Sequence, residues 1–495
     1  MRVINDIAQL ISNYFPRFAT ILTTILFVVF MILNISQDYD KIVSFVKRVF
    51  DLRRHIDSLF YENKRKKMNK TLYQKDYLEW QKDILSIIYS GLIEEKNEEL
   101  QKLNSNCSIG FTEIDVKNDK NTYESITLQM EPVDFPFRDV CPKNKEYFKR
   151  KKLSKEKEPQ IVKDNKKIVN EYYRLIKETI RYPKRVGFML DSIEINTTDK
   201  HNDLSSPWYL KSYVGIYENN LKTSHIMEYE LYKYYISYTK NKKNNLIEKY
   251  KNSDSEKEKK IIRDKILSCL PIRKYIHDQF RQNEKESDVL ISGKYRNSLL
   301  GVQAFVIVKN YSGSYDALRI RRSENVSAKP GFIQFIPSGG FESMNDCNDY
   351  DSQWDNYSLT KSIFRELLEE CFGQNEDDKA ISGNTVSPDR IYSNNHIKKL
   401  IHMLEDGTAQ MQLMGTSMNL VGLRQELSFI LKIDDYDFAN ELIGNYESKS
   451  AVHLVDIKNL ESEDFWTDDD LKNLNCTSAG LFELARNSKI YRDCL

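Results

Sequence analysis

The most constraining feature of the sequence is a short acidic stretch on a predicted helix, Arg365-Glu366-Leu367-Leu368-Glu369-Glu370. Its three glutamates stand at i, i+3 and i+4, so their carboxylates share one helical face. Like charges at this spacing repel one another unless a cation lies among them. Magnesium is a hard cation that binds carboxylate and phosphate oxygens. The helix is therefore a candidate site for magnesium-dependent phosphate chemistry.

The residues before this helix have an α/β pattern. Three apolar segments predict strands: 301–308, 315–320 and 332–337. The last of them leads into a predicted turn at Gly339 and Gly340, and the helix is expected from Ser358 to about Phe372, with Gly373 as its stop. Glycine lets backbone groups approach a ligand closely. The order strand, glycine turn, acidic helix would place that ligand against the carboxylates.

These residues resemble the signature of the Nudix hydrolase family, in which a glycine-started loop leads to a helix reading Arg-Glu-apolar-x-Glu-Glu-x-Gly. Five positions match the signature in order: Arg365, Glu366, Leu367, Glu369 and Glu370. The resemblance covers residues 298–495. It implies an α/β/α sandwich with a mixed sheet.

The resemblance also implies roles for individual residues. The metal-binding glutamates of the family correspond to Glu366, Glu369 and Glu370. Arg365 would orient one of these carboxylates, and the Gly339-Gly340 turn would offer a backbone carbonyl to Mg²⁺ or Mn²⁺. A further acidic ligand usually comes from a later strand or loop, and Glu426 is the candidate here. Water activated by the metal would attack a diphosphate, with Glu366, Glu369 and Arg365 as the catalytic residues.

The sequence departs from the signature at three places. The loop between Gly340 and the helix is enlarged and rich in Asp and Asn. Tyr357 stands where the signature has a glutamate, and Phe372 stands where it has a glycine, with Gly373 one place later. The first substitution removes a carboxylate that helps to fix the loop, and the second alters the end of the helix. Neither removes an expected metal ligand.

The second strong feature is an uncharged, largely apolar segment at residues 18–37. About 20 apolar residues span a bilayer core, so we expect one transmembrane helix here, with a cleaved signal peptide or a buried core helix as alternatives. Positive charges follow the segment at Lys41, Lys47, Arg48, Arg53 and Arg54. This distribution predicts a single-pass protein of the inner (cell) membrane, with residues 1–17 outside and the C-terminal bulk cytoplasmic. Membrane lipid is then an expected partner.

The region between this segment and the α/β unit is less informative. Apolar residues from Ile42 to Leu59 recur in a heptad pattern, and residues 38–101 are expected to be a juxtamembrane helical region. A threonine stripe at Thr20, Thr23 and Thr24 could support a homo-oligomer, or it could simply face lipid. Residues 102–297 are expected to form an α-rich intermediate domain with charged linkers, and no chemistry is assigned to them.

Composition excludes some classes of function. A chain of 495 residues predicts two or three folded units. Lys and Arg number 74 against 73 Asp and Glu, so there is no global field to attract nucleic acid, and we expect no direct nucleic-acid binding. The seven cysteines include no Cys-x-x-Cys pair. A disulfide framework or a zinc site is therefore not expected, and a reducing compartment is.

Taken as a whole, the order of anchor, helical region and Nudix-like domain resembles the membrane-anchored Nudix effectors of bacterial cyclic-oligonucleotide antiphage systems (CBASS). That resemblance implies a nucleotide or cyclic-oligonucleotide ligand, made by a functionally linked nucleotidyltransferase, that binds the cytoplasmic part and provokes action at the membrane. The alternative is a magnesium-dependent, membrane-tethered Nudix hydrolase of a nucleoside-diphosphate-linked substrate. A membrane scaffold with an inactive Nudix fold is the third hypothesis.

Overall fold

The computed structural model describes residues 47, 58–116, 119–142, 148–149, 158–180, 184–196, 206–240, 246–322, 331–343, 356–373, 388–442, 452–462 and 464–495. The chain divides into two compact units, residues 1–72 with 173–180 and residues 73–172 with 181–495. In the first unit, residues 58–72 form a helix. The predicted segments 1–17 and 18–37 lie outside the described residues. Within the described ranges, no helix combines the length and hydrophobicity of a membrane span.

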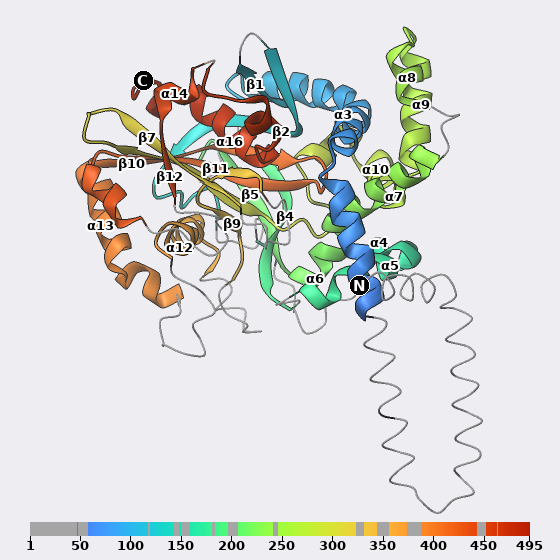
Figure 1. The fold of residues 1–495 in the computed structure, drawn as a ribbon, viewed down its shortest axis with the longest axis horizontal. Helices are drawn as coiled ribbons and strands as arrows, with labels where there is room; N and C mark the ends of the chain where they lie inside the picture. Colours follow the sequence, from blue (N-terminus) through green and yellow to red (C-terminus); the bar gives the residue numbers. More distant parts are fainter. Residues whose placement is uncertain are drawn as a thin grey trace, which may run out of the picture. The chain divides into compact units, whose positions relative to one another are not determined.

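In the second unit, the described residues form a mixed sheet of nine strands (Figure 1). The strands lie in the order β1 (Ser108–Val116), β2 (Asp119–Asp134), β10 (Ala409–Asn419), β11 (Arg424–Ile433), β6 (Gly301–Lys309), β7 (Tyr315–Arg321) and β12 (His453–Asp456). Two short strands extend it: β8 (Ile333–Phe335) pairs with β7, and β9 (Ser338–Gly340) pairs with β6. Strands β11 and β6 are parallel, and the other pairs are antiparallel. The expected mixed sheet is therefore present.

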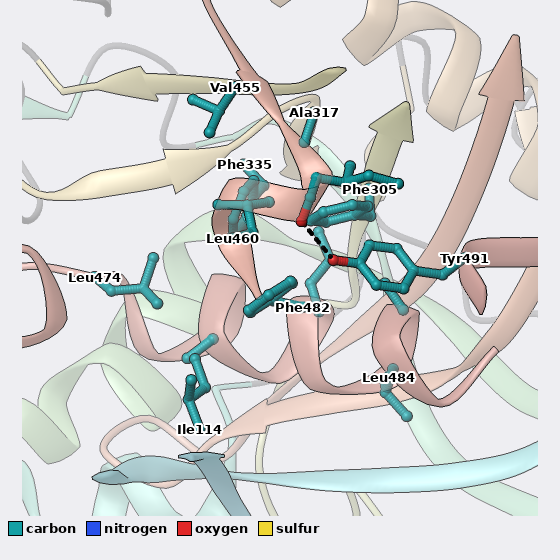
Figure 2. Close-up of a cluster of buried hydrophobic side chains, with 14 of the residues drawn as sticks. Ile114, Phe305, Ala317, Phe335, Val455, Leu460, Leu474, Phe482, Leu484 and Tyr491 are labelled. Atoms are coloured by element: carbon teal, nitrogen blue, oxygen red, sulfur yellow. Dashed lines mark hydrogen bonds between the residues drawn. The ribbon is translucent and has the colours of Figure 1, made fainter. Parts of the chain in front are cut away.

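One face of this sheet packs against helix α16 (Cys476–Asn487). Phe305 on β6, Phe482 on α16 and Tyr491 pack together in a buried cluster (Figure 2). The Gln303 side chain, two residues from Phe305 and so on the same face of β6, donates to the Thr477 carbonyl at the start of α16. The odd-numbered residues of β6 therefore face α16.

The opposite face of the sheet packs against helix α12 (Leu359–Cys371), which contacts β6 and β9. Phe364 of α12 stacks on Phe135, Phe135 contacts Phe137, and Phe137 contacts Phe429 of β11. Phe429 pairs with Ala304, an even-numbered residue of β6. The first eight residues of β6 are all buried, as expected of a strand that is covered on both faces.

A second sheet has the order β3 (Phe148–Lys149), β5 (Trp208–Ile216) and β4 (Val186–Ile195). Isolated bridges join Gly187 of β4 to Glu342 and Met189 of β4 to Leu299. This sheet is thereby attached to the ends of β9 and β6.

Helices make up most of the remaining described structure. They are α3 (Lys75–Leu103), α4 (Gln160–Asp164), α5 (Lys166–Ile176), η2 (Lys177–Thr179), α6 (Tyr217–Asn220), the π-helix η3 (Leu221–His225), α7 (Ile226–Lys240), α8 (Leu246–Lys251), α9 (Glu256–Ser268), α10 (Pro271–Asn283), η4 (Glu286–Leu290), η6 (Pro388–Ser393), α13 (Asn395–Asp406), η7 (Tyr436–Glu441), α14 (Ile457–Leu460), α15 (Asp468–Lys472) and α17 (Lys489–Arg492). Within the second unit, α3, α7, α8, α9 and α10 contact one another.

The domain boundaries differ from the sequence-based expectation. We expected residues 102–297 to form an α-rich domain that precedes a separate unit at 298–495, and residues 38–101 to form one helical region. Strands β1 and β2 instead belong to the main sheet, and the chain divides after residue 72. Strand β2 lies between β1 and β10, so its alternating polar residues Ser125 and Thr127 are buried together with Ile126 and Leu128. This burial of polar residues concealed the strand in the sequence.

Candidate functional site

The acidic helix forms where the sequence predicts it. The Ser358 hydroxyl accepts a hydrogen bond from the Lys361 backbone N–H and caps α12 at its N-terminus. Phe372 is the C-cap, and Gly373 follows with a φ of 63°, a left-handed conformation that suits glycine. The predicted limits, Ser358 to about Phe372, are therefore confirmed.

Two of the three glutamates turn toward β9. Glu366 is 6% exposed and Glu370 is 5% exposed, whereas Glu369 is partly exposed. The Ser338 backbone N–H donates to Glu370 Oε2 at 2.6 Å. Since Glu366 and Glu370 are one helical turn apart, both carboxylates lie against the same short strand.

Arg365 links one of these carboxylates to the glycine strand. Its guanidinium is buried, and Nη2 donates to the Gly340 carbonyl at 2.6 Å and to Glu366 Oε1. Hydrogen bonds between a guanidinium and a carboxylate are strong because both groups are charged. Arg365 thus fixes the orientation of the Glu366 side chain relative to β9.

The glycine pair is a strand rather than the open turn that the sequence suggested. Gly339 pairs with Val302 and Gly340 with Gly301, in antiparallel register. A Cβ atom built on Gly339 would collide with the Glu366 carboxylate. Glycine is required here because it allows the carboxylate to lie directly on the backbone.

Glu426 lies on the other side of this strand pair. It pairs with Gly301, and a Cβ on Gly301 would meet Glu426 Cγ at 2.9 Å and the Gly339 carbonyl oxygen at 3.3 Å. Neighbouring residues of a strand face opposite sides of a sheet. Glu366 borders Gly339, whose partner is Val302, so the two glutamates approach β9 from opposite faces. Glu426 can reach the Gly339 carbonyl only from the α16 side.

Two positions that depart from the family signature have structural roles. Tyr357 is 1% exposed, its ring stacks on Phe341 and contacts Phe188, and burial raises the pKa of its hydroxyl well above the ordinary value. Phe372 stacks on the imidazole of His396 with ring centroids 4.1 Å apart. Tyr357 therefore cannot replace the loop carboxylate, because its side chain belongs to the core.

The side chains and backbone groups on the α12 face of β9 are of the types that bind a hard cation. Carboxylate and backbone carbonyl oxygens are the ligands that Mg²⁺ prefers, and Gly339 provides a close approach that any side chain would fill. In the part of the chain that the structure describes, no three His, Cys, Asp or Glu side chains are gathered closely enough to hold a metal ion. A cation there would be held by Glu366 and Glu370 with the partly exposed Glu369, after local adjustment of their side chains.

The turn between β10 and β11 is held by a scaffold that no sequence pattern indicated. Arg273, which is fully buried on α10, donates to the carbonyls of Leu420 (2.9 Å) and Val421. Arg296 donates to the Leu423 carbonyl at 3.1 Å. Both arginines are far from this turn in sequence, so local patterns could not reveal the contacts. They fix the turn that leads into β11 and therefore into Glu426.

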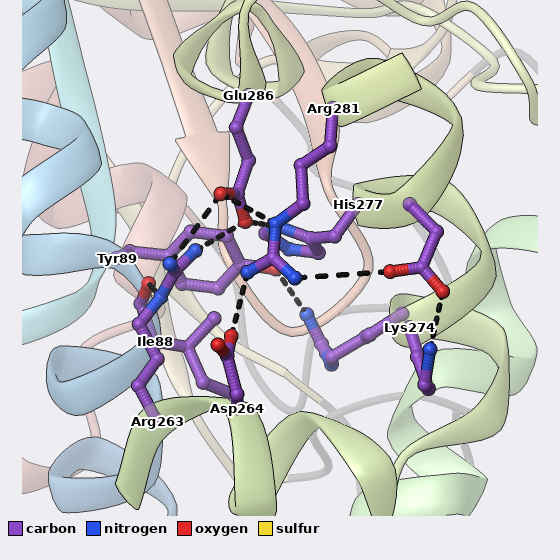
Figure 3. A network of polar contacts seen from close by, with 10 residues as sticks. Ile88, Tyr89, Arg263, Asp264, Lys274, His277, Arg281 and Glu286 are labelled. Carbon is purple, nitrogen blue, oxygen red and sulfur yellow. Dashed lines mark hydrogen bonds and ion pairs between the residues drawn. The ribbon is translucent and has the colours of Figure 1, made fainter. Parts of the chain in front are cut away.

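Arg273 belongs to a helix that is itself braced by ion pairs (Figure 3). Glu286 contacts His277 and Arg281 at 2.8 Å each, and it also pairs with Arg263. Burial alone would raise the pKa of Glu286, but its hydrogen bonds with His277, Arg281 and Arg263 outweigh burial and lower it well below the ordinary value. Arg281 also binds Asp264 at 2.7 Å. The network joins α9, α10 and η4, and so it fixes the helix that carries Arg273.

Among solved structures, part of the chain is similar to the crystal structure of a NUDIX hydrolase from Alicyclobacillus acidocaldarius. The two share 13% sequence identity over 33% of this chain and 81% of that chain, with a TM-score of 0.19. No protein-family model matches the chain, and no curated protein matches it. The geometry of α12 and β9 is therefore the basis for a functional assignment.

Proposed function

We propose that the second unit binds a nucleoside-diphosphate-linked ligand through Mg²⁺ or Mn²⁺ on the α12 face of β9, and hydrolyses it as a Nudix-type enzyme. One observation carries this proposal. The buried carboxylates of Glu366 and Glu370 lie against a glycine strand, with Arg365 between Glu366 and the Gly340 carbonyl. Buried carboxylates without a function would be costly to retain.

Each residue has a defined part in this chemistry. Glu366 and Glu370 would hold the cation together with the Gly339 carbonyl, and Arg365 would keep Glu366 in position. When bound, the cation would neutralise phosphate charge and lower the pKa of water. Glu369, on the same helix and partly exposed, is suited to accept the proton of the attacking water. The water oxygen would bond to one phosphorus, the bridging P–O bond would break, and the other phosphate would leave with the bridging oxygen.

The test is hydrolysis of ADP-ribose by the full chain in detergent, with AMP release followed by chromatography in Mg²⁺, in Mn²⁺ and in EDTA. We expect metal-dependent release that Glu366→Gln and Glu369→Gln each reduce by about a hundredfold or more. Glu405→Gln, an exposed glutamate on α13, is the matched control. Turnover in EDTA, or full activity of Glu366→Gln, would contradict the proposal.

Ligand sensing without turnover is the second candidate function. It is favoured by Tyr357, which fills with a buried aromatic ring the position where the Nudix signature has a glutamate. In this form the chain would be a membrane-anchored effector of the CBASS kind. A cyclic oligonucleotide from a linked nucleotidyltransferase would bind the cytoplasmic part, and the segment 18–37 would act in the inner membrane as a homo-oligomer.

A double variant, Glu369→Gln with Glu370→Gln, distinguishes the two candidate functions. In cells that carry the linked nucleotidyltransferase, retained antiphage activity of this variant would exclude the need for hydrolysis. Loss of activity while cyclic-dinucleotide binding persists would exclude sensing alone. A Thr20, Thr23 and Thr24 to leucine variant tests the membrane step, since it changes only the predicted helix contact.

A further inference from the structure

The helix of residues 58–72 in the first unit has an unbalanced charge. Its cationic residues fall within seven consecutive positions: Lys64, Arg65, Lys66, Lys67 and Lys70. Its one acidic residue is Glu62. Five positive charges and one negative charge give this helix a net charge of +4, whereas the whole chain has a net charge of +1. Positive charge is therefore concentrated on helix 58–72.

Three of the lysines lie on the exposed side of this helix. Met68 and Leu72, which are four residues apart, are buried and mark the opposite side. Lys66, Lys67 and Lys70 are exposed. Residues three and four apart are neighbours on a helix surface, so Lys70 lies next to both Lys66 and Lys67. These three lysines therefore form one exposed cationic face.

Most of the charge on this cationic face is not neutralised by the described protein. Lys66 pairs with Glu62 at 2.7 Å, but an ion pair between exposed side chains is weak and is screened by salt. Among the residues that the structure describes, Lys67 and Lys70 take part in no ion pair. An uncompensated cationic face attracts anionic partners.

An exposed apolar side chain lies on the same side of the helix. Leu59 is 46% exposed and precedes Lys66 by seven residues, so it lies two turns earlier on this side. Helices that lie at a membrane surface combine such side chains, because the apolar group enters the boundary between headgroups and acyl chains while the lysines meet the headgroups. The phosphate backbone of a nucleic acid offers no comparable place for Leu59. The composition of the face therefore favours lipid over nucleic acid.

Membrane topology does not account for these lysines. The positive-inside rule counts cations within about 15–20 residues of a membrane span. The cations that orient the predicted span at 18–37 end at Arg54, whereas Lys66, the first lysine of the cationic face, is 29 residues beyond Gln37. The orientation of the predicted span is therefore explained without Lys66, Lys67 and Lys70.

We propose that the exposed side of helix 58–72, formed by Leu59, Lys66, Lys67 and Lys70, binds the anionic headgroups of the membrane surface. Clusters of about four to eight Lys and Arg residues on an amphipathic helix attract anionic lipid, with a gain of about fivefold in affinity for each cation near the surface. The inference rests on the membrane location proposed above and adds the class of lipid. It uses no residue of the α12 site.

The experiment is native mass spectrometry of the full chain in detergent, titrated with palmitoyl-oleoyl phosphatidylglycerol or, separately, with palmitoyl-oleoyl phosphatidylcholine. The two lipids have the same acyl chains and differ in headgroup charge. We expect the native chain to bind phosphatidylglycerol about tenfold or more tightly than phosphatidylcholine. The triple variant Lys66→Gln, Lys67→Gln and Lys70→Gln should reduce this preference to about twofold or less, because the cationic face is removed.

The matched control is a triple variant of three exposed lysines on α9: Lys257→Gln, Lys260→Gln and Lys265→Gln. Helix α9 also carries acidic residues, and Lys259 there pairs with Glu256 at 2.9 Å. This control removes the same number of charges and should keep the native preference. Raising NaCl from about 0.1 M to about 0.5 M should weaken the preference of the native chain, because salt screens exposed charges.

Two results would overturn the inference: equal binding of the two lipids by the native chain, or a native preference retained by the triple variant of helix 58–72. The second result would assign lipid selection to cations nearer the predicted span. If that variant does not fold, a preference that is unchanged by salt overturns the inference. Binding of polyuridylate through the same lysines, without a lipid preference, would assign the face to nucleic acid and also overturn it. The variant should hydrolyse ADP-ribose as the native chain does, so failure of the hydrolase proposal is recognised separately.

Discussion

Replacing Gly339 by alanine tests the α12 site with a single methyl group. The added Cβ would occupy the space of the Glu366 carboxylate, so the carboxylate must move. Glu366 cannot swing into solvent without breaking its pair with Arg365, and both side chains are buried. Gly339→Ala should therefore displace Glu366 and also disturb the bond from Arg365 to the Gly340 carbonyl.

The size of the effect follows from that displacement. Non-bonded heavy atoms do not approach a Cβ atom closer than 3.0 Å, and the carboxylate of Glu366 lies inside that limit of the Cβ that alanine would add at position 339. The carboxylate must therefore shift on the order of 1 Å. A shift of about 1 Å at a catalytic group can reduce the rate about a hundredfold. Overpacking of this type costs about 1–3 kcal/mol of stability. A hundredfold loss of rate corresponds to about 2.7 kcal/mol, so the losses of function and of stability should be similar in free energy.

The assay compares Gly339→Ala with Gly110→Ala, a glycine of β1 around which a Cβ would meet nothing within 4 Å. Mn²⁺ affinity measured by electron paramagnetic resonance should weaken by about 10- to 100-fold for Gly339→Ala and should not change for Gly110→Ala. Urea unfolding of both variants measures the change in the free energy of unfolding. A Gly339→Ala protein that binds Mn²⁺ with native affinity would refute the reasoning, because Glu366 would then not need its observed position.

Three further predictions concern the scaffold and the anchor. Burial raises the pKa of Glu230 to about 7, despite its contact with Arg273, so the folded state binds an extra proton between the unfolded value near 4.5 and pH 7. Stability should therefore fall by about 3 kcal/mol as pH rises through that window, and Glu230→Gln should flatten the slope in urea unfolding. Arg273→Met removes the ion pair at 3.3 Å and leaves Glu230 buried without its partner. The free energy of unfolding should fall by about 3–5 kcal/mol in the same assay. A loss of stability below about 1 kcal/mol would contradict this prediction. Deleting residues 1–46 should move the protein from the membrane fraction to the soluble fraction in cell fractionation.

The sequence predicted α12 well because its signals are local. The spacing of apolar and acidic residues and the terminal glycine fall within sixteen consecutive residues, from Ser358 to Gly373. The apolar strands β6 and β7 were recognised for the same reason. Strand β2 was not, because its burial depends on β1 and β10 on either side, and β10 is more than 270 residues away in sequence.

Strand register decided the parts of the site that could not be predicted. Glu426 was chosen from the sequence as an acid on a later strand, but its face depends on whether it pairs with Gly301 or Val302. A shift of one residue exchanges the two faces of a strand. The contact between His225 and Arg424 joins residues 199 apart, and no local pattern marks either as a partner of the other.

The glycine strand β9 separates the two faces of the sheet at the candidate site. Gly339 admits the Glu366 carboxylate from the α12 face, whereas on the opposite face the space over Gly301 and Gly340 is filled by the side chains of Glu426 and Glu342. A side chain at Gly339 would displace the Glu366 carboxylate. The cation site proposed on the α12 face therefore depends on this one backbone position.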